Sequence, residues 1–482
     1  LILAPEIALT PMLFSRFKSR LREPIAILHS GLSERERSRQ WHLLREGKVA
    51  VALGARSSIL APIRNPGLII VDEEHESAFK QEDRLRYNAR DMAILLGSRS
   101  GATVVLGSAT PSLESYHHAR TGKYRHLELR SRITGHSLPE VRIVDLRKCA
   151  MTGSISPPLR LALEETLKEK RQAMLLLNRR GFSSSLICAR CGEACRCPNC
   201  SVSLTWYQTR AQLLCHYCAH QERAPGACPH CGSPEWGPGA RGTESLENEV
   251  RGLFPEARVL RIDRESMAAR GRLEDALVAI ARGEADIIVG TQMIAKGHDF
   301  PGVTLVGVLD ADGAINLPDF RSSERSFQLF TQMAGRAGRG DWFGRVIMQT
   351  YNPDHPSILL SARHDFRAFA EWELENRLRF RYPPFTRMAR VLSTDASEPR
   401  ARAAAEKMAG WVRAWENASV ELLGPAPSLL SRVQGKYRWN FLLKSAHPQG
   451  LHHVLSSLEA AARKGIPAST AVQIDVDPAT LM

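Results

Sequence analysis

The sequence predicts an α/β protein with two parallel-sheet domains, a cysteine module inserted in the second, and a C-terminal α+β domain. Three observations support this. Short apolar runs alternate with helical stretches in two series, eight cysteines form four C-x-x-C pairs within the second series, and the last segment alternates strands and helices. Strands buried on both faces of a parallel sheet are continuous apolar runs, and helices connect them.

Changes of composition predict where each part of the 482-residue chain begins and ends. The runs "LILA", "IAIL", "VAVAL", "LIIVD" and "TVVLG" define a first domain over 1–132, and a basic, proline-containing linker follows over 133–172. The runs "AMLLLN", "ARVLRID", "ADIIVG", "TLVGVL" and "RVIMQT" define a second domain over 173–352. A helical linker over 353–387 ends in the rigid "RYPPF". The order strand, helix, strand, strand, helix, strand over 388–482 predicts a small split βαβ fold.

The bulk composition favours a polyanionic partner. Lys and Arg total 65 against 51 for Asp and Glu, a formal charge of +14, which suits nucleic acid but also an ordinary basic enzyme. No run of 18 apolar residues and no signal peptide occur, so we expect a cytoplasmic protein with no membrane partner. The chain starts with Leu, and "LILAPE" is typical of a strand entering a loop, so we expect further sequence upstream.

The stretch "LIIVDEEH" ends a buried strand in acidic residues. Asp72 is placed to hold Mg²⁺, usually through water, beside nucleotide phosphates, and Glu73 to orient or deprotonate the attacking water. The next strand ends in "LGSATPS", whose small hydroxyl residues suit a close ligand or the coupling of neighbouring sites. Taken alone, the first motif could equally be an acidic loop after a buried strand, and the second could equally be an ordinary helix cap.

The stretch "QMAGRAGRG" carries two arginines three residues apart. On a helix, Arg336 and Arg339 would face one side, from which they could stabilise charge during phosphoryl transfer. Gln332 would contact nucleotide beside them. The alternative is a solvated basic helix end.

A glycine-rich loop, "GTQMIAKGHDFPG", lies between two further apolar runs. Lys296 and Asp299 are candidates for nucleotide contact, and Thr291 for contact with a nucleic-acid phosphate. These four motifs follow the order found in the superfamily 2 helicase motor, in which ATP binds between two RecA-like domains. "LAPEIALT", "HSGLSERER" and "GARSSILAP" resemble its nucleic-acid-binding motifs, and the last contains Arg56.

The cysteine-rich segment over 188–240 is the most specific signal. Thiolates at C-x-x-C spacing can occupy two corners of a tetrahedron, so four pairs provide two Cys₄ sites for Zn²⁺, with iron–sulfur as the rival. The pattern in a long chain without an export signal argues against a disulfide scaffold. The pairs are Cys188/Cys191, Cys197/Cys200, Cys215/Cys218 and Cys228/Cys231. Spacing leaves open which pairs share an ion, and Cys195 is a spare.

Motor motifs combined with this module resemble the primosomal protein N′ (PriA) family of bacterial replication restart helicases. "DEEH", "GSATP", "LNRRGF", the eight cysteines, "GTE", "GTQMIAKGHDFP" and "QMAGRAGR" are similar in type and order. The resemblance implies nested zinc sites, with the two outer cysteine pairs on one ion and the two inner pairs on the other.

The resemblance also implies an activity. It is ATP-dependent 3′→5′ DNA unwinding, a hydrolase and isomerase function, at forked and single-stranded DNA during restart, repair and recombination. The implied partners are primosome proteins, the replicative helicase loader and the single-strand DNA-binding protein, in a nucleoid-associated bacterial setting.

In this family, a loop after "DEEH" couples DNA binding to hydrolysis, and here it is "ESAFKQEDRLRYNARD". Aromatic rings stack on bases and basic groups bind phosphates, so Phe79, Lys80, Arg84 and Tyr87 are expected DNA contacts. Leu85 stands where the family usually carries a tryptophan. A mobile exposed loop is the alternative.

The phosphate loop G-x-x-x-x-G-K-[ST] occurs nowhere in the 482 residues. In the family it lies just before "LILAPE", so we expect a chain lacking its N-terminal part, with poor ATP binding on its own. Two alternatives remain: a non-catalytic zinc-containing scaffold that binds DNA and partners, and a translocase that moves on duplex DNA without separating the strands.

Overall fold

The structure is a computed structural model, and it divides into two compact units, Leu1–Leu127 and Glu128–Met482, each described here by itself. The residues that it describes are 1–5, 11–83, 85–129, 139–151, 153–177, 185–207, 212–236, 243–263, 266–267, 272–291, 300, 302–338, 342–415 and 419–481.

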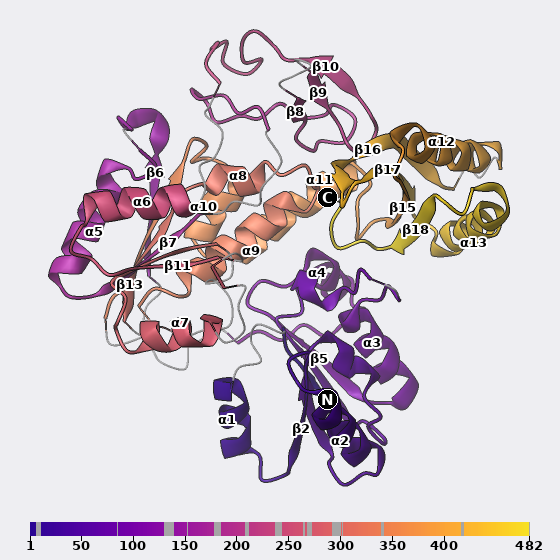
Figure 1. Ribbon diagram of the computed structural model, residues 1–482, viewed down its shortest axis with the longest axis horizontal. Helices are drawn as coiled ribbons and strands as arrows, with labels where there is room; N and C mark the ends of the chain where they lie inside the picture. The colour runs from indigo at the N-terminus through magenta and orange to yellow at the C-terminus, as the bar shows by residue number, and fades with distance from the viewer. Residues whose placement is uncertain are drawn as a thin grey trace. The chain divides into compact units, whose positions relative to one another are not determined.

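The first unit is a five-stranded parallel sheet in the order β2-β3-β1-β4-β5 (Figure 1). Its strands are β1 (Ile2–Leu3), β2 (Ile25–Leu28), β3 (Val51–Gly54), β4 (Leu68–Asp72) and β5 (Thr103–Gly107). Its helices are α1 (Pro11–Arg20), α2 (Glu34–Arg45), α3 (Ala89–Ser100) and α4 (Leu113–Arg120), with short 3₁₀ turns η2 (Arg56–Leu60) and η3 (Ser77–Phe79). The register pairs Asp72 with Gly107, which brings the ends of β4 and β5 together.

The second unit contains a six-stranded parallel sheet in the order β11-β12-β7-β13-β14-β6. Its strands are β6 (Glu140–Asp145), β7 (Gln172–Leu176), β11 (Val259–Ile262), β12 (Ile287–Gly290), β13 (Val303–Val308) and β14 (Arg345–Thr350). Its helices are α5 (Pro157–Lys168), α6 (Thr243–Leu253), α7 (Arg272–Ala281), α8 (Ala311–Ile315) and α9 (Ser322–Ala334), and η4 (Leu146–Lys148) is a 3₁₀ turn.

The segment expected to be a linker contributes strand β6 to this sheet. Residues 140–145 pair in parallel with β14, from Glu140 opposite Arg345 to Asp145 opposite Thr350. The linker prediction is wrong for these residues because "EVRIVD" alternates polar and apolar side chains. An edge strand has that pattern, whereas a continuous apolar run is typical of a strand buried on both faces.

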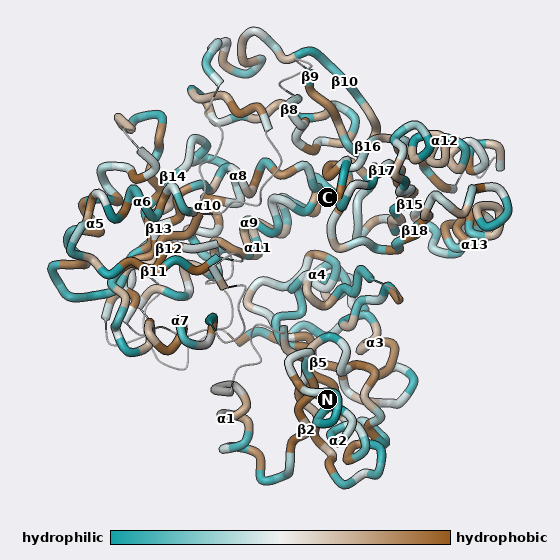
Figure 2. The backbone as a smooth tube through the Cα atoms, in the orientation of Figure 1, coloured by the Kyte–Doolittle hydropathy of each residue, from teal (hydrophilic) through white to brown (hydrophobic). Residues whose placement is uncertain are grey.

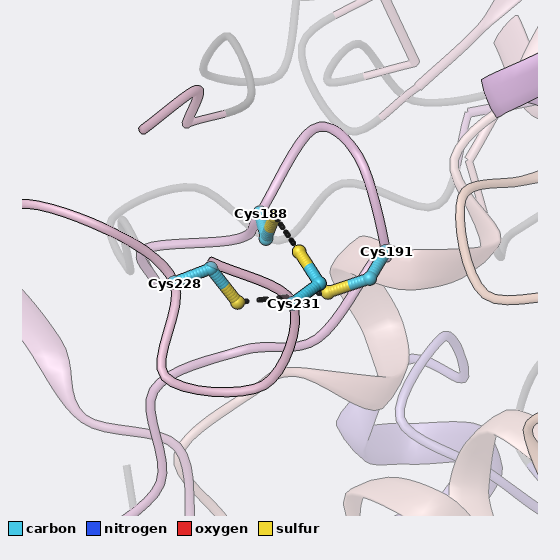
Figure 3. A group of neighbouring side chains, drawn as sticks. All are labelled: Cys188, Cys191, Cys228 and Cys231. Carbon is cyan, nitrogen blue, oxygen red and sulfur yellow. Dashed lines mark hydrogen bonds between the residues drawn. The ribbon is translucent and has the colours of Figure 1, made fainter. Parts of the chain in front are cut away.

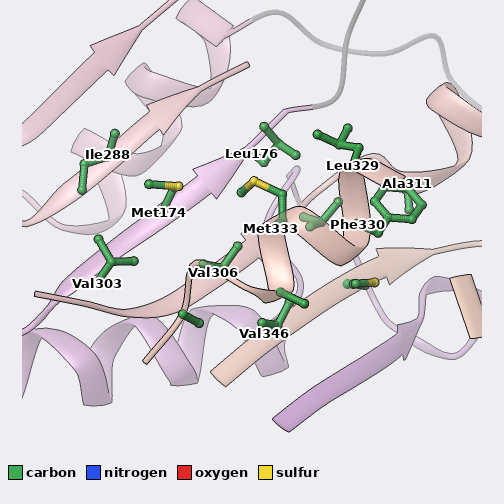
Figure 4. Packing of buried hydrophobic residues seen from close by; sticks show 14 of the residues in the cluster. Met174, Leu176, Ile288, Val303, Val306, Ala311, Leu329, Phe330, Met333 and Val346 are labelled. Atoms are coloured by element: carbon green, nitrogen blue, oxygen red, sulfur yellow. The ribbon is translucent and has the colours of Figure 1, made fainter. Parts of the chain in front are cut away.

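The core of the second sheet lies on both of its faces. Met174 and Leu176 of β7 belong to one buried cluster, and Ala173 and Leu175 of the same strand belong to the other. Side chains alternate across a strand, so one apolar run serves two cores. Figure 4 shows the first cluster, where Met174 and Val306 of the sheet face Met333 of α9. Each such buried side chain contributes roughly 1.5–3 kcal/mol. Figure 2 shows hydrophobic colours along the strands of this sheet.

The cysteine-rich module lies between β7 and α6 in the sequence. Its three short antiparallel strands are β8 (Thr205–Tyr207), β9 (Gln212–Leu214) and β10 (Gln221–Arg223), in the order β10-β9-β8.

The remaining residues form two helices and then an α+β domain. The helices are α10 (Pro356–Ala362) and α11 (Phe366–Arg379). The antiparallel sheet has the order β16-β17-β15-β18. Its elements are β15 (Arg387–Asp395), α12 (Glu398–Ala414), β16 (Glu421–Val433), β17 (Lys436–Ser445), α13 (Pro448–Gly465) and β18 (Ala471–Val476), which confirms the predicted order. Within the described residues, no helix has the length and apolar character needed to cross a membrane.

Candidate functional site

The acidic motif begins where β4 ends. Glu73 has a φ of 49°, a left-handed backbone rare outside glycine, and its N–H donates to Asp72 Oδ1 at 3.1 Å. Although Asp72 is partly exposed, desolvation by the surrounding protein raises its pKa, opposed by the Glu73 N–H and the charge of His75. A bound cation would favour the ionised carboxylate that Mg²⁺ requires.

His75 joins the two motifs on adjacent strands. Its Nδ1 lies 2.7 Å from Ser108 Oγ and 3.6 Å from Glu73 Oε2. Ser108 Oγ in turn accepts from the Thr110 N–H at 3.0 Å. A movement at the end of β4 would therefore displace the end of β5 through the His75–Ser108 contact, and the reverse also holds.

Glu74 is a buried residue to which the sequence analysis gave no role. Its carboxylate accepts hydrogen bonds from the Ser112 N–H at 2.6 Å, Ser112 Oγ at 3.0 Å and Ser115 Oγ at 2.9 Å. Arg90 donates to it at 3.2 Å and to Ser112 at 2.8 Å. A buried carboxylate needs such partners, and these tie α3, α4 and both motifs together. The sequence signal that could have indicated this role is "TPS" before a helix, because Ser112 is the N-cap of α4 as well as a partner of Glu74.

Arg56 holds the loop that follows the acidic motif. Its guanidinium donates to the carbonyls of Lys80 at 2.6 Å and Ala78 at 3.0 Å. Phe79 is only 1% exposed and packs in the core of the first unit, and Lys80 is also buried. A ring that stacks on a base must be accessible, so the assignment of Phe79 to DNA stacking is wrong for this conformation; its apolar ring completes the core instead.

The exposed part of the loop is a narrow turn. The Gln81 N–H donates to the Tyr87 carbonyl at 2.7 Å, which closes it, and Leu85 is 70% exposed at its tip. Tyr87 is half-buried against the core. Arg84 lies outside the described residues.

The arginine motif of the second unit differs from its predicted geometry. Helix α9 ends at Ala334, and Arg336 lies in the following turn, where its N–H donates to the Met333 carbonyl at 3.0 Å. The prediction that both arginines lie on a helix face is therefore wrong for Arg336, because two glycines follow the helix closely. Gln332 is in the last turn of α9 and is half-buried. Arg339 lies outside the described residues.

The glycine-rich loop is largely outside the described residues, including Lys296 and Asp299. Thr291 is described. It directly follows β12, is half-buried, and its N–H donates to the Ile262 carbonyl at 3.3 Å. It therefore lies beyond the carboxyl end of its strand.

The eight paired cysteines form two separate groups, and the sulfurs of each group lie within 4.8 Å of one another. The first site comprises Cys188, Cys191, Cys228 and Cys231, and the second comprises Cys197, Cys200, Cys215 and Cys218. This grouping confirms the nested arrangement. In the first site, the Cys188–Cys231 and Cys191–Cys228 sulfurs are each 3.6 Å apart (Figure 3).

The donor geometry fits a tetrahedral ion. Zn–S bonds of about 2.3 Å in a tetrahedron separate sulfurs by about 3.8 Å. The sulfurs of Cys197 and Cys218 in the second site are also 3.6 Å apart, and all four sulfurs of each site lie within 4.8 Å of one another. Four thiolates leave no open position, so either site would hold a structural ion and not a catalytic one.

Cys195 belongs to neither group of described ligands. It is buried, and desolvation raises the pKa of its thiol to about 11. Its side chain belongs to the buried hydrophobic cluster around the second site, so it has a packing role.

Comparisons with known proteins agree with these sites. Residues 1–119 match a DEAD/DEAH box helicase family and 242–341 a helicase conserved C-terminal domain. Residues 197–223 match the PriA DNA helicase Cys-rich region domain, and 379–479 match the primosomal protein N C-terminal domain.

Full-length relatives are similar along the whole chain. It is 42% identical to the replication restart protein PriA of Bacillus subtilis (strain 168), with 100% of this chain and 60% of that protein covered. The PriA protein of Haemophilus influenzae is 39% identical, with 100% of this chain and 66% of that protein covered. The PriA protein of Treponema pallidum is 38% identical, with 100% of this chain and 72% of that protein covered. The chain thus spans about 60% of the length of the first of these relatives.

Proposed function

Because the chain belongs to the PriA family of replication restart proteins, we propose that it provides the motor, zinc and C-terminal domains of an ATP-dependent 3′→5′ DNA helicase. This helicase restarts stalled forks and starts primosome assembly in the bacterial cytoplasm, close to the nucleoid. Roles in DNA repair and recombination follow from the same activity.

The observation that carries this proposal is the link between the ends of β4 and β5. The His75–Ser108 contact and the buried Glu74 join an acidic strand end to the next motif, as an ATP-driven motor requires. Asp72 would hold Mg²⁺, which would supply charge neutralisation at the phosphates, and Glu73 would orient the attacking water.

Residues of the second motor domain would also contact nucleotide. Arg336 and Arg339 stabilise charge on the transferred phosphoryl group, as arginines do in phosphoryl transfer. Gln332, Lys296 and Asp299 contact the nucleotide.

DNA contacts come from the coupling loop and from the end of β12. Arg84, Tyr87 and Thr291 contact single-stranded or forked DNA. Arg56 acts chiefly by holding the loop, since its guanidinium donates to the carbonyls of Ala78 and Lys80.

The two cysteine sites hold Zn²⁺ and stabilise a module that meets protein partners. We assign primosome proteins, the replicative helicase loader and the single-strand DNA-binding protein to this module and to the C-terminal domain. Basic charge, +14 overall, supports contact with DNA.

A non-catalytic scaffold is the second candidate, because no G-x-x-x-x-G-K-[ST] phosphate loop occurs in the 482 residues. It would keep the zinc module and the motor folds to bind DNA and partners without turnover.

The variant Glu73→Gln in the full-length protein tests the proposal. We expect DNA-stimulated ATP hydrolysis to fall roughly 100-fold or more, with fork binding unchanged, because the water loses its general base. Glu82→Gln, an exposed acid in the same loop, is the matched control and should keep full activity.

Wild-type turnover in Glu73→Gln would exclude Glu73 from the mechanism. A wild-type protein that binds forks and two zinc ions but hydrolyses no ATP would establish the scaffold.

A further inference from the structure

Helix α9 has a buried junction at its N-terminal end and the arginine motif at its other end. The junction consists of Tyr217, Phe320 and Tyr382, from the zinc module, the start of α9 and the segment after α11. The three side chains are 1%, 8% and 4% exposed, respectively. Such packing permits little independent movement of the three segments.

Direct contacts run from the second zinc site to α9. The Phe320 N–H donates to the Tyr217 hydroxyl at 3.1 Å, and Tyr217 lies within the Cys215–Cys218 ligand pair. The Phe320 ring stacks on Tyr382 with 4.6 Å between centroids and 12° between planes. The Tyr382 hydroxyl donates to the Cys200 carbonyl at 2.8 Å. Two ligand turns of the same site are thus attached to one end of α9.

The same end of α9 is fixed to the C-terminal residues. Asp319 is buried and accepts hydrogen bonds from Arg325 at 3.1 Å and from the Leu481 N–H at 3.3 Å. One turn into α9, Glu324 pairs with the buried Arg377 of α11 at 2.6 Å. These charge-assisted contacts join the start of the helix to α11 and to the C-terminal residues, so that the three segments move together.

The helix itself is a rigid connection. Its 13 residues extend roughly 20 Å and are buried along most of their length, including Phe327, Phe330 and Met333. Gln332 is in its last turn, and Arg336 follows. A displacement at the C-terminal end of α9, next to Arg336, would therefore also move the junction at its N-terminal end.

We propose that the junction of Tyr217, Phe320 and Tyr382 transmits the ATP-dependent movement of α9 to the second zinc site. Strand separation depends on this transmission, whereas ATP hydrolysis does not, because the residues proposed for hydrolysis lie at the opposite end of α9 and in the first unit. The inference rests on the proposed helicase function and names the positioning residues that couple its two activities.

The double variant Tyr217→Phe/Tyr382→Phe in the full-length protein tests the transmission. It keeps both rings and removes two hydroxyls that bridge the segments. We expect two zinc ions per chain and near-wild-type DNA-stimulated ATP turnover. Base pairs separated per ATP hydrolysed should fall roughly tenfold, because the two buried hydrogen bonds that join the segments are lost.

Tyr207→Phe is the matched control. This tyrosine is also in the zinc module, but its hydroxyl, 3.4 Å from His216, makes neither of the two hydrogen bonds that the double variant removes. The number of base pairs separated per ATP should therefore stay unchanged. Phe320→Leu is the second test variant. It retains apolar volume without the stacked ring, and it should also uncouple unwinding from hydrolysis.

The measured number of base pairs separated per ATP decides between the proposal and its alternatives. An unchanged ratio in both test variants with zinc retained overturns the proposal, as does a parallel loss of hydrolysis and unwinding. Absence of unwinding in the wild-type protein defeats the helicase function itself, which distinguishes that failure from a failure of the junction.

Discussion

The two zinc sites use the same turn but with different residues in it. In each C-x-x-C pair, the residue after the second cysteine has a positive φ and donates its N–H to the first cysteine's carbonyl, at 2.8–3.0 Å. That residue is Gly192 or Gly232 in the first site, and Ser201 or Ala219 in the second. A side chain in this conformation costs roughly 1–2 kcal/mol.

The surroundings explain why the second site tolerates this cost. Its ligands Cys197, Cys200 and Cys215 belong to a buried cluster that includes residues of α9's start and of the C-terminal sheet. His216 also bonds to the Pro427 carbonyl at 2.8 Å. Metal chemistry therefore sets the ligand spacing in both sites, whereas packing decides how much backbone strain each can hold.

Loss of one ligand should produce the largest difference between the sites. Cys215→Ser should lower the melting temperature more than Cys228→Ser, because the second site anchors three segments and structural zinc contributes folding free energy directly. Each variant should retain one zinc ion by elemental analysis. Equal melting temperatures would show that the surrounding contacts add nothing.

The two glycines of the first site should not be equivalent. A Cβ at Gly192 would lie 2.5 Å from the Tyr351 carbonyl carbon, whereas one at Gly232 meets nothing within 4 Å. Gly232→Ala should cost only the conformational penalty of about 1–2 kcal/mol, and Gly192→Ala roughly 3 kcal/mol or more. Denaturant titration of both variants measures this, and a reversed order would refute the packing argument.

Near the second site, Glu373 should make stability depend on pH. Burial raises the pKa of Glu373 to about 7. Arg377 only partly offsets this, because the same guanidinium also pairs with Glu324, which is closer to it. The folded state then binds a proton that the unfolded state releases above a pKa of about 4.5. This contribution, roughly 3 kcal/mol, is full below pH 4.5 and is lost as pH rises through 7.

Comparison of Glu373→Gln with the wild type over pH 5–8 measures this contribution, since the variant should lack that part of the slope. Identical slopes in the two proteins would place the titration elsewhere.

The smallest effect should come from relieving the strained turns of the second site. Ala219→Gly should raise the free energy of unfolding by about 1–2 kcal/mol, because glycine avoids the penalty that a side chain carries at positive φ. Gly substitution at Ala276, a buried helical residue, is a control that should destabilise. If Ala219→Gly destabilises instead, the left-handed turn is not strained in the folded protein.

The sequence was informative wherever chemistry is local. Cysteine spacing predicted the eight ligands, and apolar runs predicted most strands, because each of these signals lies within a few neighbouring residues. The division of the ligands into two nested sites came from the family resemblance and not from the spacing. Glu74 was missed because its partners, Arg90 and Ser112, are far along the chain and meet it only through the sheet. Phe79 was misassigned because composition does not reveal on which side of a turn a ring lies.

Strand β6 has a consequence for how the second unit assembles. It precedes β7 in the chain, yet it pairs with β14, so Glu140 can pair with Arg345 only after the rest of the sheet has been synthesised. The first edge to be synthesised is therefore the last to find its neighbour, and the inserted zinc module can fold in the interval. Such long-range closure slows folding and leaves a strand edge open for longer. A chain of this design depends on reaching β14 before another strand occupies that edge.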